Sequence, residues 1–143
     1  MADAGNGKMT TLREPLHIDA VAGLDPNTPV VMLNLMKFRE RSLDGSGSGW
    51  DAYRRYSAHT IKLMKARGAT IVWAGDVRAV ALGPVTDGDW DYVALVWYPT
   101  PAAFVDMLTS PEYAIGNVHR ENGTERHVIL ALHAAYSKLA TPV

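Results

Sequence analysis

The side chains of this sequence that could bind or transform a small molecule are one amide within an apolar run and several aromatic and charged groups elsewhere. Asn34 interrupts the run VVMLNLMKF. A buried amide costs free energy unless its groups are hydrogen-bonded, so another polar group must face it. The residues predicted to converge with it on an apolar pocket are Tyr53, Tyr56, His59, Trp73, Tyr113 and Arg120.

If this pocket is catalytic, Asn34 and Tyr53 would stabilise an enolate or phenolate and His59 would accept a proton. The reaction would be that of a cofactor-independent oxygenase or isomerase acting on an acidic or phenolic compound, with its anionic group held by Arg120. The same residues could hold a metabolite without turnover, as in a binding or sensing module, and the sequence does not separate the two classes. The ligand-binding residues would be Tyr56, Trp73, Tyr113 and Arg120.

Each of these residues also has an ordinary structural interpretation. Tyrosines pack with their hydroxyls at the rim of a core, and Asn34 could bond to the backbone. Arg120 could pair with a surface carboxylate. Four independently placed polar groups, Asn34, Tyr53, Tyr113 and Arg120, would then all need a structural partner, so the sequence favours neither interpretation.

Metal and thiol chemistry have less support. The chain has no cysteine, which excludes disulfides and thiolate sites. His127 and His133 share a strand face but lie about 20 Å apart, too far to ligate one ion. The other three histidines, His17, His59 and His119, lack metal-binding spacing. We therefore expect no metal and no cofactor.

The elements that would position these residues follow the order βαββαβ. Val30 to Phe38 and Tyr92 to Tyr98 are continuous apolar runs, typical of central strands. A helix opens at Ser48 and ends at Gly68, and a second helical region opens at Thr100-Pro101 and again at Ser110-Pro111. The two remaining strands are predicted over Ala69 to Leu82 and Arg126 to Tyr136.

This order predicts an α+β, ferredoxin-like fold. Two right-handed β-α-β units placed side by side give a four-stranded antiparallel sheet in the order 4-1-3-2, with the helices on one face. Apolar residues occupy both faces of the two central strands, so the face without helices should be covered by a second copy. The sequence therefore predicts a homodimer.

Five segments occur in an order that resembles the domain of unknown function 1330 family. These are LNLMKF, the paired Tyr53 and Tyr56, GATIVWAGDV, DWDYVALVWYPTPAAF and SPEY. The resemblance covers Val30 to Tyr136 and implies the dimeric α/β-barrel superfamily, in which ferredoxin-like monomers face each other through their sheets. It implies no reaction, because members of the family have no established one.

Length and charge limit the possible domain organisation, partners and location of the protein. The 143 residues, 48% apolar and 20% charged, suit one domain over residues 30–143, preceded by a partly disordered N-terminal extension over residues 1–29. The net charge of -1 without a basic stripe argues against a nucleic-acid partner. No apolar run approaches about 18 residues and no signal peptide is visible, so we expect a soluble, cytoplasmic protein that does not bind membranes.

Overall fold

The computed structural model describes residues 12–139. No helix in this described part is long and apolar enough to cross a membrane. A 3₁₀ turn, Val85–Gly88, precedes the third strand. The helices and strands, in chain order, are α1 (Ile18–Ala22), β1 (Val30–Phe38), α2 (Gly49–Ala66), β2 (Thr70–Asp76), β3 (Tyr92–Tyr98), α3 (Pro101–Leu108), α4 (Pro111–Gly123) and β4 (Thr124–Leu132).

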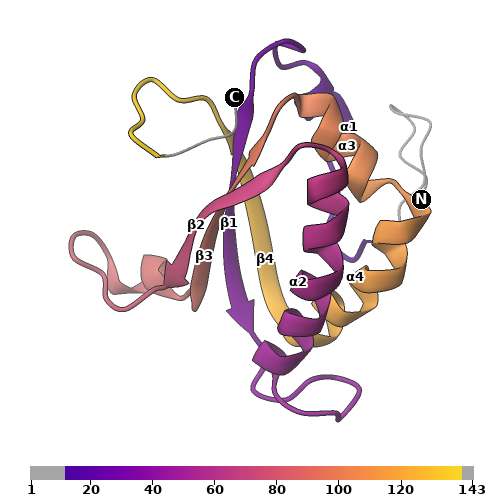
Figure 1. The fold of residues 1–143 in the computed structure, drawn as a ribbon. Helices are drawn as coiled ribbons and strands as arrows, with labels where there is room; N and C mark the ends of the chain where they lie inside the picture. Colours follow the sequence, from indigo (N-terminus) through magenta and orange to yellow (C-terminus); the bar gives the residue numbers. More distant parts are fainter. Residues whose placement is uncertain (1–11, 140–143) are drawn as a thin grey trace.

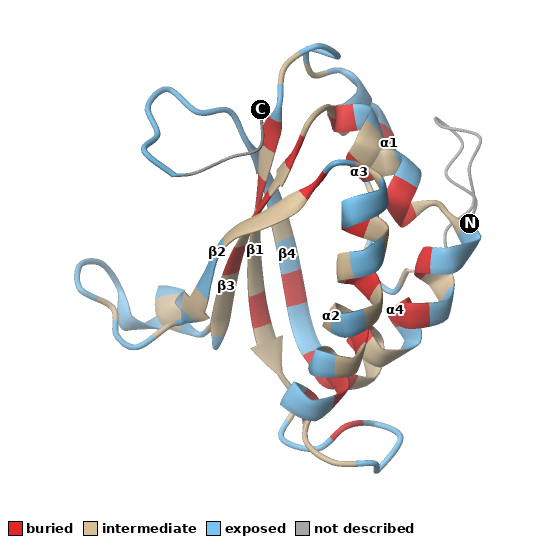
Figure 2. Ribbon diagram, in the orientation of Figure 1, coloured by how far each residue is buried: buried red, intermediate tan, exposed pale blue. Residues whose placement is uncertain are grey.

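The four strands form one antiparallel sheet in the order β2-β3-β1-β4. This is the predicted order 4-1-3-2 read from the other edge, so the predicted βαββαβ topology is confirmed. The helices cover one face of the sheet (Figure 1). The core lies between that face and the helices, where most of the buried positions gather (Figure 2).

Local capping signals begin and end the helices where the sequence predicts. The Ser48 side chain accepts a hydrogen bond from the Asp51 amide, and the Asp51 carboxylate accepts one from the Ser48 amide, which completes a capping box. Gly68 follows α2 with φ of +74°, a conformation that favours glycine. Thr100 and Ser110 cap α3 and α4 through their hydroxyls.

Strand β2 departs from its prediction in length and in register. It ends at Asp76 rather than Leu82. Strict alternation places Ile71 and Trp73 on the same face, but the pairing shifts between these two residues, and Trp73 pairs with Leu95. This bulge turns Trp73 away from the helices, because the side chain of Leu95 belongs to the helix-free face.

The helix-free face of the sheet is apolar across all four strands. The pairing aligns Trp73, Leu95, Leu33 and Leu130 in one row. Trp73 is 49% exposed and Leu130 is 47% exposed. Exposed aromatic and aliphatic side chains in one contiguous row indicate an interaction surface.

The part of the N-terminal extension that the structure describes packs on the domain. Helix α1 contacts α3, and Ile18 is buried. Arg13 donates from its backbone amide to Glu121 on α4 and from its guanidinium to the Thr124 carbonyl. The first 11 residues of the predicted extension lie outside the described residues. Residues 12–17, which run past α4 toward α1, are called the N-terminal strap below.

Candidate functional site

A cavity of about 130 Å³ lies beside the core, between the N-terminal strap, the inner face of the sheet, α3 and α4. We call it the arginine cavity. Its walls are mainly apolar, with polar groups gathered toward α4 and β4. The apolar lining includes Leu12, Leu16, Met32, Phe104, Leu108 and Ile129, and the polar lining is Glu14, His17, Tyr113, Arg120 and His127.

Arg120 on α4 is the central polar group of this cavity. Its side chain is 5% exposed. Nε donates to Asn117 Oδ1 at 2.6 Å, and Nη1 donates to His127 Nδ1 at 3.0 Å. Nη2 donates to Glu14 Oε1 at 2.9 Å and, at 3.4 Å, to Glu121 Oε2. The guanidinium therefore joins α4, β4 and the N-terminal strap.

His127 on β4 is held as a neutral imidazole of one tautomer. Arg120 has no acceptor, so His127 Nδ1 must accept its hydrogen bond and the ring proton must be on Nε2. Nε2 then donates to Asn34 Oδ1 at 2.9 Å. Burial and the neighbouring Arg120 guanidinium lower the pKa of His127 to about 3. Both ring nitrogens are in use, so His127 is poorly placed to act as a base.

Asn34 has hydrogen-bond partners for both ends of its amide. Its Oδ1 accepts from His127, and its Nδ2 donates to the carbonyls of Met32, at 3.2 Å, and Ala94, at 3.4 Å. The predicted need for a facing polar group is met by His127, a residue that the sequence reasoning considered only as a metal ligand. This environment gives Asn34 a complete structural role.

Asn34, Tyr53, Tyr56 and Tyr113 do meet at a second space between the sheet and the helices, the tyrosine cavity, but it measures only about 30 Å³. That volume suits a single water molecule rather than an organic ligand. The hydroxyls of Tyr56 and Tyr113 share a hydrogen bond at 2.9 Å. Burial raises the pKa of Tyr53 and of Tyr113 above the ordinary value, so both stay protonated and can act only as neutral groups.

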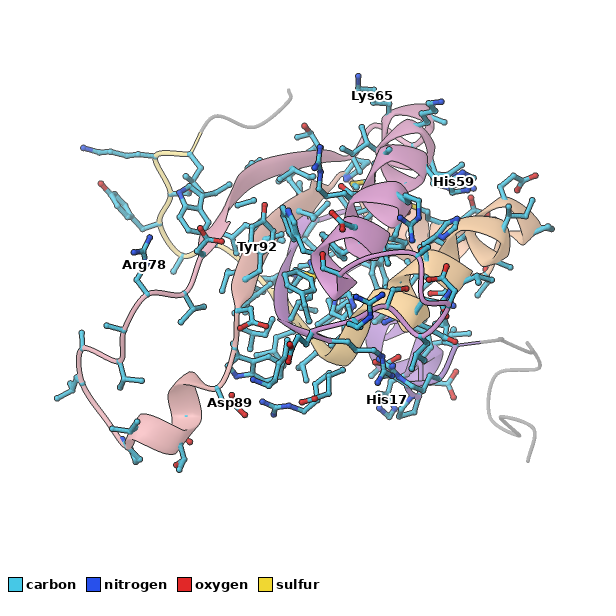
Figure 3. The ribbon with its side chains drawn as sticks, turned by 90° about the horizontal axis from the view of Figure 1, so that it is seen from below. His17, His59, Lys65, Arg78, Asp89 and Tyr92 are labelled. Atoms are coloured by element: carbon cyan, nitrogen blue, oxygen red, sulfur yellow. The ribbon has the colours of Figure 1, made fainter. Side chains whose placement is uncertain are left out.

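Two of the predicted site residues lie away from both cavities. The His59 Nε2 is 2.7 Å from the Glu112 carbonyl, and its ring packs against Gly116, so His59 joins α2 to α4. Figure 3 shows it well separated from His17. Trp73 lies on the helix-free face because of the β2 bulge, with its ring over Gly75. The structure therefore does not bring His59 or Trp73 to the predicted pocket.

Sequence reasoning missed Glu14 and His127 as parts of the site. Glu14 precedes the first periodic element, and no motif distinguishes it. The signal for His127 was present, because it sits on a strand that must pair beside Asn34 in the order 4-1-3-2. Among residues 12–139, no three histidine or carboxylate side chains gather in a metal-binding group.

Comparison with solved structures shows a likeness over most of the chain. The methylated RPA0582 protein is 30% identical and covers 91% of this chain and 99% of its own, with a TM-score of 0.77. A second structure of RPA0582, a protein of unknown function from Rhodopseudomonas palustris, is 29% identical with the same TM-score and covers 87% of this chain. Residues 30–143 make up about four fifths of the chain, so a match over 91% extends into the N-terminal segment.

More distant structures share the fold alone. A dimeric protein of unknown function with a ferredoxin-like fold from Bacteroides fragilis is 12% identical over 77% of this chain and all of its own, with a TM-score of 0.50. A hydroxynitrile lyase from Passiflora edulis is 15% identical over 78% of this chain and all of its own, with a TM-score of 0.51. No protein-family model matches the chain, and no curated protein matches it.

Proposed function

The chain belongs to the family of the Rhodopseudomonas palustris protein RPA0582, and on this premise we propose that it binds a small organic molecule in the arginine cavity. The observation that carries the proposal is an apolar cavity of about 130 Å³ with a buried guanidinium on its wall. An engineered apolar cavity of about 150 Å³ is large enough for benzene, so the ligand would be about the size of a single ring with a small substituent.

A ligand screen followed by a cavity-filling variant tests this proposal. A molecule that binds only the folded state raises stability by about 2.7 kcal/mol when present at 100 times its Kd, which a thermal melt detects. Leu16→Phe adds volume from the N-terminal strap and should abolish the shift, whereas Leu43→Phe should leave it unchanged, because Leu43 is exposed and outside the cavity. Equal shifts in both variants would place binding elsewhere.

A catalytic role, as a cofactor-independent oxygenase or isomerase, is a second candidate. It is favoured by His17, which lies on the cavity wall and whose side chain makes no hydrogen bond to another described residue. An imidazole in this position can accept a proton from a bound molecule. His17→Ala should then abolish turnover of a ligand found in the screen while leaving its Kd unchanged. Retained turnover in that variant would exclude His17 as the base.

We also propose a homodimer joined through the helix-free face of the sheet. The row formed by Trp73, Leu95, Leu33 and Leu130 would otherwise remain in water, and the related fold from Bacteroides fragilis is described as dimeric. Sedimentation should give a dimer at micromolar concentration. Leu33→Glu should produce a monomer, and Leu43→Glu, at an exposed position in the loop after β1, should not. A wild-type monomer would contradict the proposal.

Two finer assignments rest on sequence features. The segments LNLMKF and SPEY support membership of the domain of unknown function 1330 family, within the dimeric α/β-barrel superfamily. The absence of cysteine is compatible with a reducing compartment, and this supports a cytoplasmic location.

A further inference from the structure

We propose that Glu14 makes the arginine cavity selective for uncharged ligands that carry a hydrogen-bond acceptor, and that it excludes carboxylates. The inference rests on the proposed binding function and specifies its ligand class. It reverses the role that the sequence suggests for Arg120, which was to hold an anionic group. The reason is that the anion on Arg120 is already supplied by the chain itself.

The first observation is that the charges around the cavity balance. Arg120 pairs with Glu14 and Glu121, at 2.9 and 3.4 Å, and Arg13 pairs with the other oxygen of the Glu14 carboxylate. His127, which is hydrogen-bonded to Arg120, is neutral. Two guanidinium groups therefore face two carboxylates, and the cluster carries no net charge.

The second observation is that Glu14 is held firmly in the ionised state. Burial alone would raise the pKa of this carboxyl, but hydrogen bonds from Arg13 and Arg120 outweigh burial and lower the pKa to about 2. A negative charge thus stays on the cavity wall at every physiological pH. An incoming carboxylate would meet that charge at close range beside a mainly apolar wall, where repulsion is screened less than in bulk water.

Arg120 also has one N–H group that is free to donate a hydrogen bond to a ligand. The guanidinium has five N–H groups, and its hydrogen bonds to Asn117, His127, Glu14 and Glu121 use four of them. One N–H on Nη1 has no partner among the described residues. A carbonyl or hydroxyl oxygen of a neutral ligand can accept from this group without disturbing the charge balance, whereas a carboxylate adds a charge that nothing compensates.

Benzamide and benzoate form a matched probe pair, because they share shape and size and differ in charge at neutral pH. Calorimetric titration of the wild-type protein should show benzamide binding at least about tenfold more tightly than benzoate. Glu14→Gln keeps a side-chain oxygen that can accept from Arg120 and removes the charge. In this variant the ratio of the two affinities should shift toward benzoate by about tenfold or more.

Glu125→Gln is the control, since it removes the same charge from an exposed position on β4 that does not line the cavity. It should keep the wild-type ratio. The inference is overturned if the wild type binds benzoate as tightly as benzamide, or if Glu14→Gln leaves the ratio within about threefold of wild type. The wild-type comparison can overturn the inference even if Glu14→Gln does not fold. If neither probe binds the wild type or the variant, it is the proposed binding function that fails.

Discussion

Two cavities lie beside the inner face of the same sheet, and they differ in what closes them. The tyrosine cavity, of about 30 Å³, lies between the sheet and the helices and is lined by Tyr53, Tyr56, Tyr98 and Tyr113 among other residues. The arginine cavity, of about 130 Å³, is closed by the N-terminal strap, an irregular segment that leaves space beneath it. Residue types thus predict the polarity of a site, whereas its volume depends on the segment that borders it.

Removing the Arg120 cation of the arginine cavity should cause the largest loss of stability. Arg120→Met keeps much of the side-chain length but removes the donor to His127 and one of the donors to Glu14 and to Glu121, which keep their hydrogen bonds from Arg13. Because the carboxylates are partly exposed and keep Arg13, the loss should be about 2–3 kcal/mol, which urea unfolding measures. Arg54→Met, at an exposed position on α2, should change stability by no more than about 0.5 kcal/mol. Equal losses in the two variants would mean that the cluster is not a structural centre.

His127 should make stability depend on pH. Its pKa is about 3 in the folded protein, below the ordinary value of 6.5, so the unfolded chain binds a proton that the folded chain does not. The resulting stability is complete above pH 6.5 and is lost as the pH falls toward 3. Between pH 6 and 4 the slope should approach about 1 kcal/mol per pH unit.

A non-titrating replacement tests this assignment. Gln at position 127 can accept from Arg120 and donate to Asn34, so His127→Gln should fold and should show a flatter pH dependence. His133→Gln, which replaces an exposed histidine after β4, should keep the wild-type slope. Denaturant melts across this pH range measure both variants. An unchanged slope in His127→Gln would show that another group carries the effect.

Substitution of Asn34 shows whether its amide has a structural role or a ligand-binding role. Asn34→Leu removes the acceptor of His127 and the donor to two backbone carbonyls, so it should cost about 1–2 kcal/mol. Because Asn34 lines only the tyrosine cavity, ligand affinity should stay within about twofold. Equal or higher stability together with lost affinity would assign Asn34 to the ligand site.

The smallest loss of stability is expected for a substitution in the tyrosine cavity. Tyr56→Phe loses one buried hydrogen bond, to the Tyr113 hydroxyl, and should cost about 1 kcal/mol with no change in ligand affinity. Tyr136→Phe, at an exposed position, should cost nothing measurable. Loss of binding in Tyr56→Phe would move the ligand site to the tyrosine cavity.

The fold could be predicted from the sequence because its signals are local. The apolar runs give the bounds of β1 and β3 as observed, and Ser48, Thr100 and Ser110 are the observed caps of α2, α3 and α4. Strand β4 was placed too late, at Arg126 to Tyr136 rather than Thr124–Leu132. There the preceding helix runs directly into the strand, so no turn marks the boundary.

The candidate site could be predicted only in part, because it depends on register and on a segment without periodicity. Trp73 lies on the opposite face because one bulge reverses the alternation of β2. The pairing of His127 with Asn34 and Arg120 requires both the β1–β4 register and the docking of α4. Glu14 comes from a strap that follows no helical or strand pattern, so its contact with Arg120 is visible only in the folded chain.

A crystal structure of the protein with benzamide would show directly where a neutral ligand binds and whether it contacts Arg120. The ligand should lie in the arginine cavity, with its ring against Leu16, Phe104 and Leu108 and its carbonyl oxygen within hydrogen-bond distance of Arg120 Nη1. The Glu14 carboxylate should still be paired with Arg120 in that complex. Ligand density in the tyrosine cavity would rule out binding beside Arg120, and density in the arginine cavity with Glu14 displaced from Arg120 would rule out the selective role of Glu14.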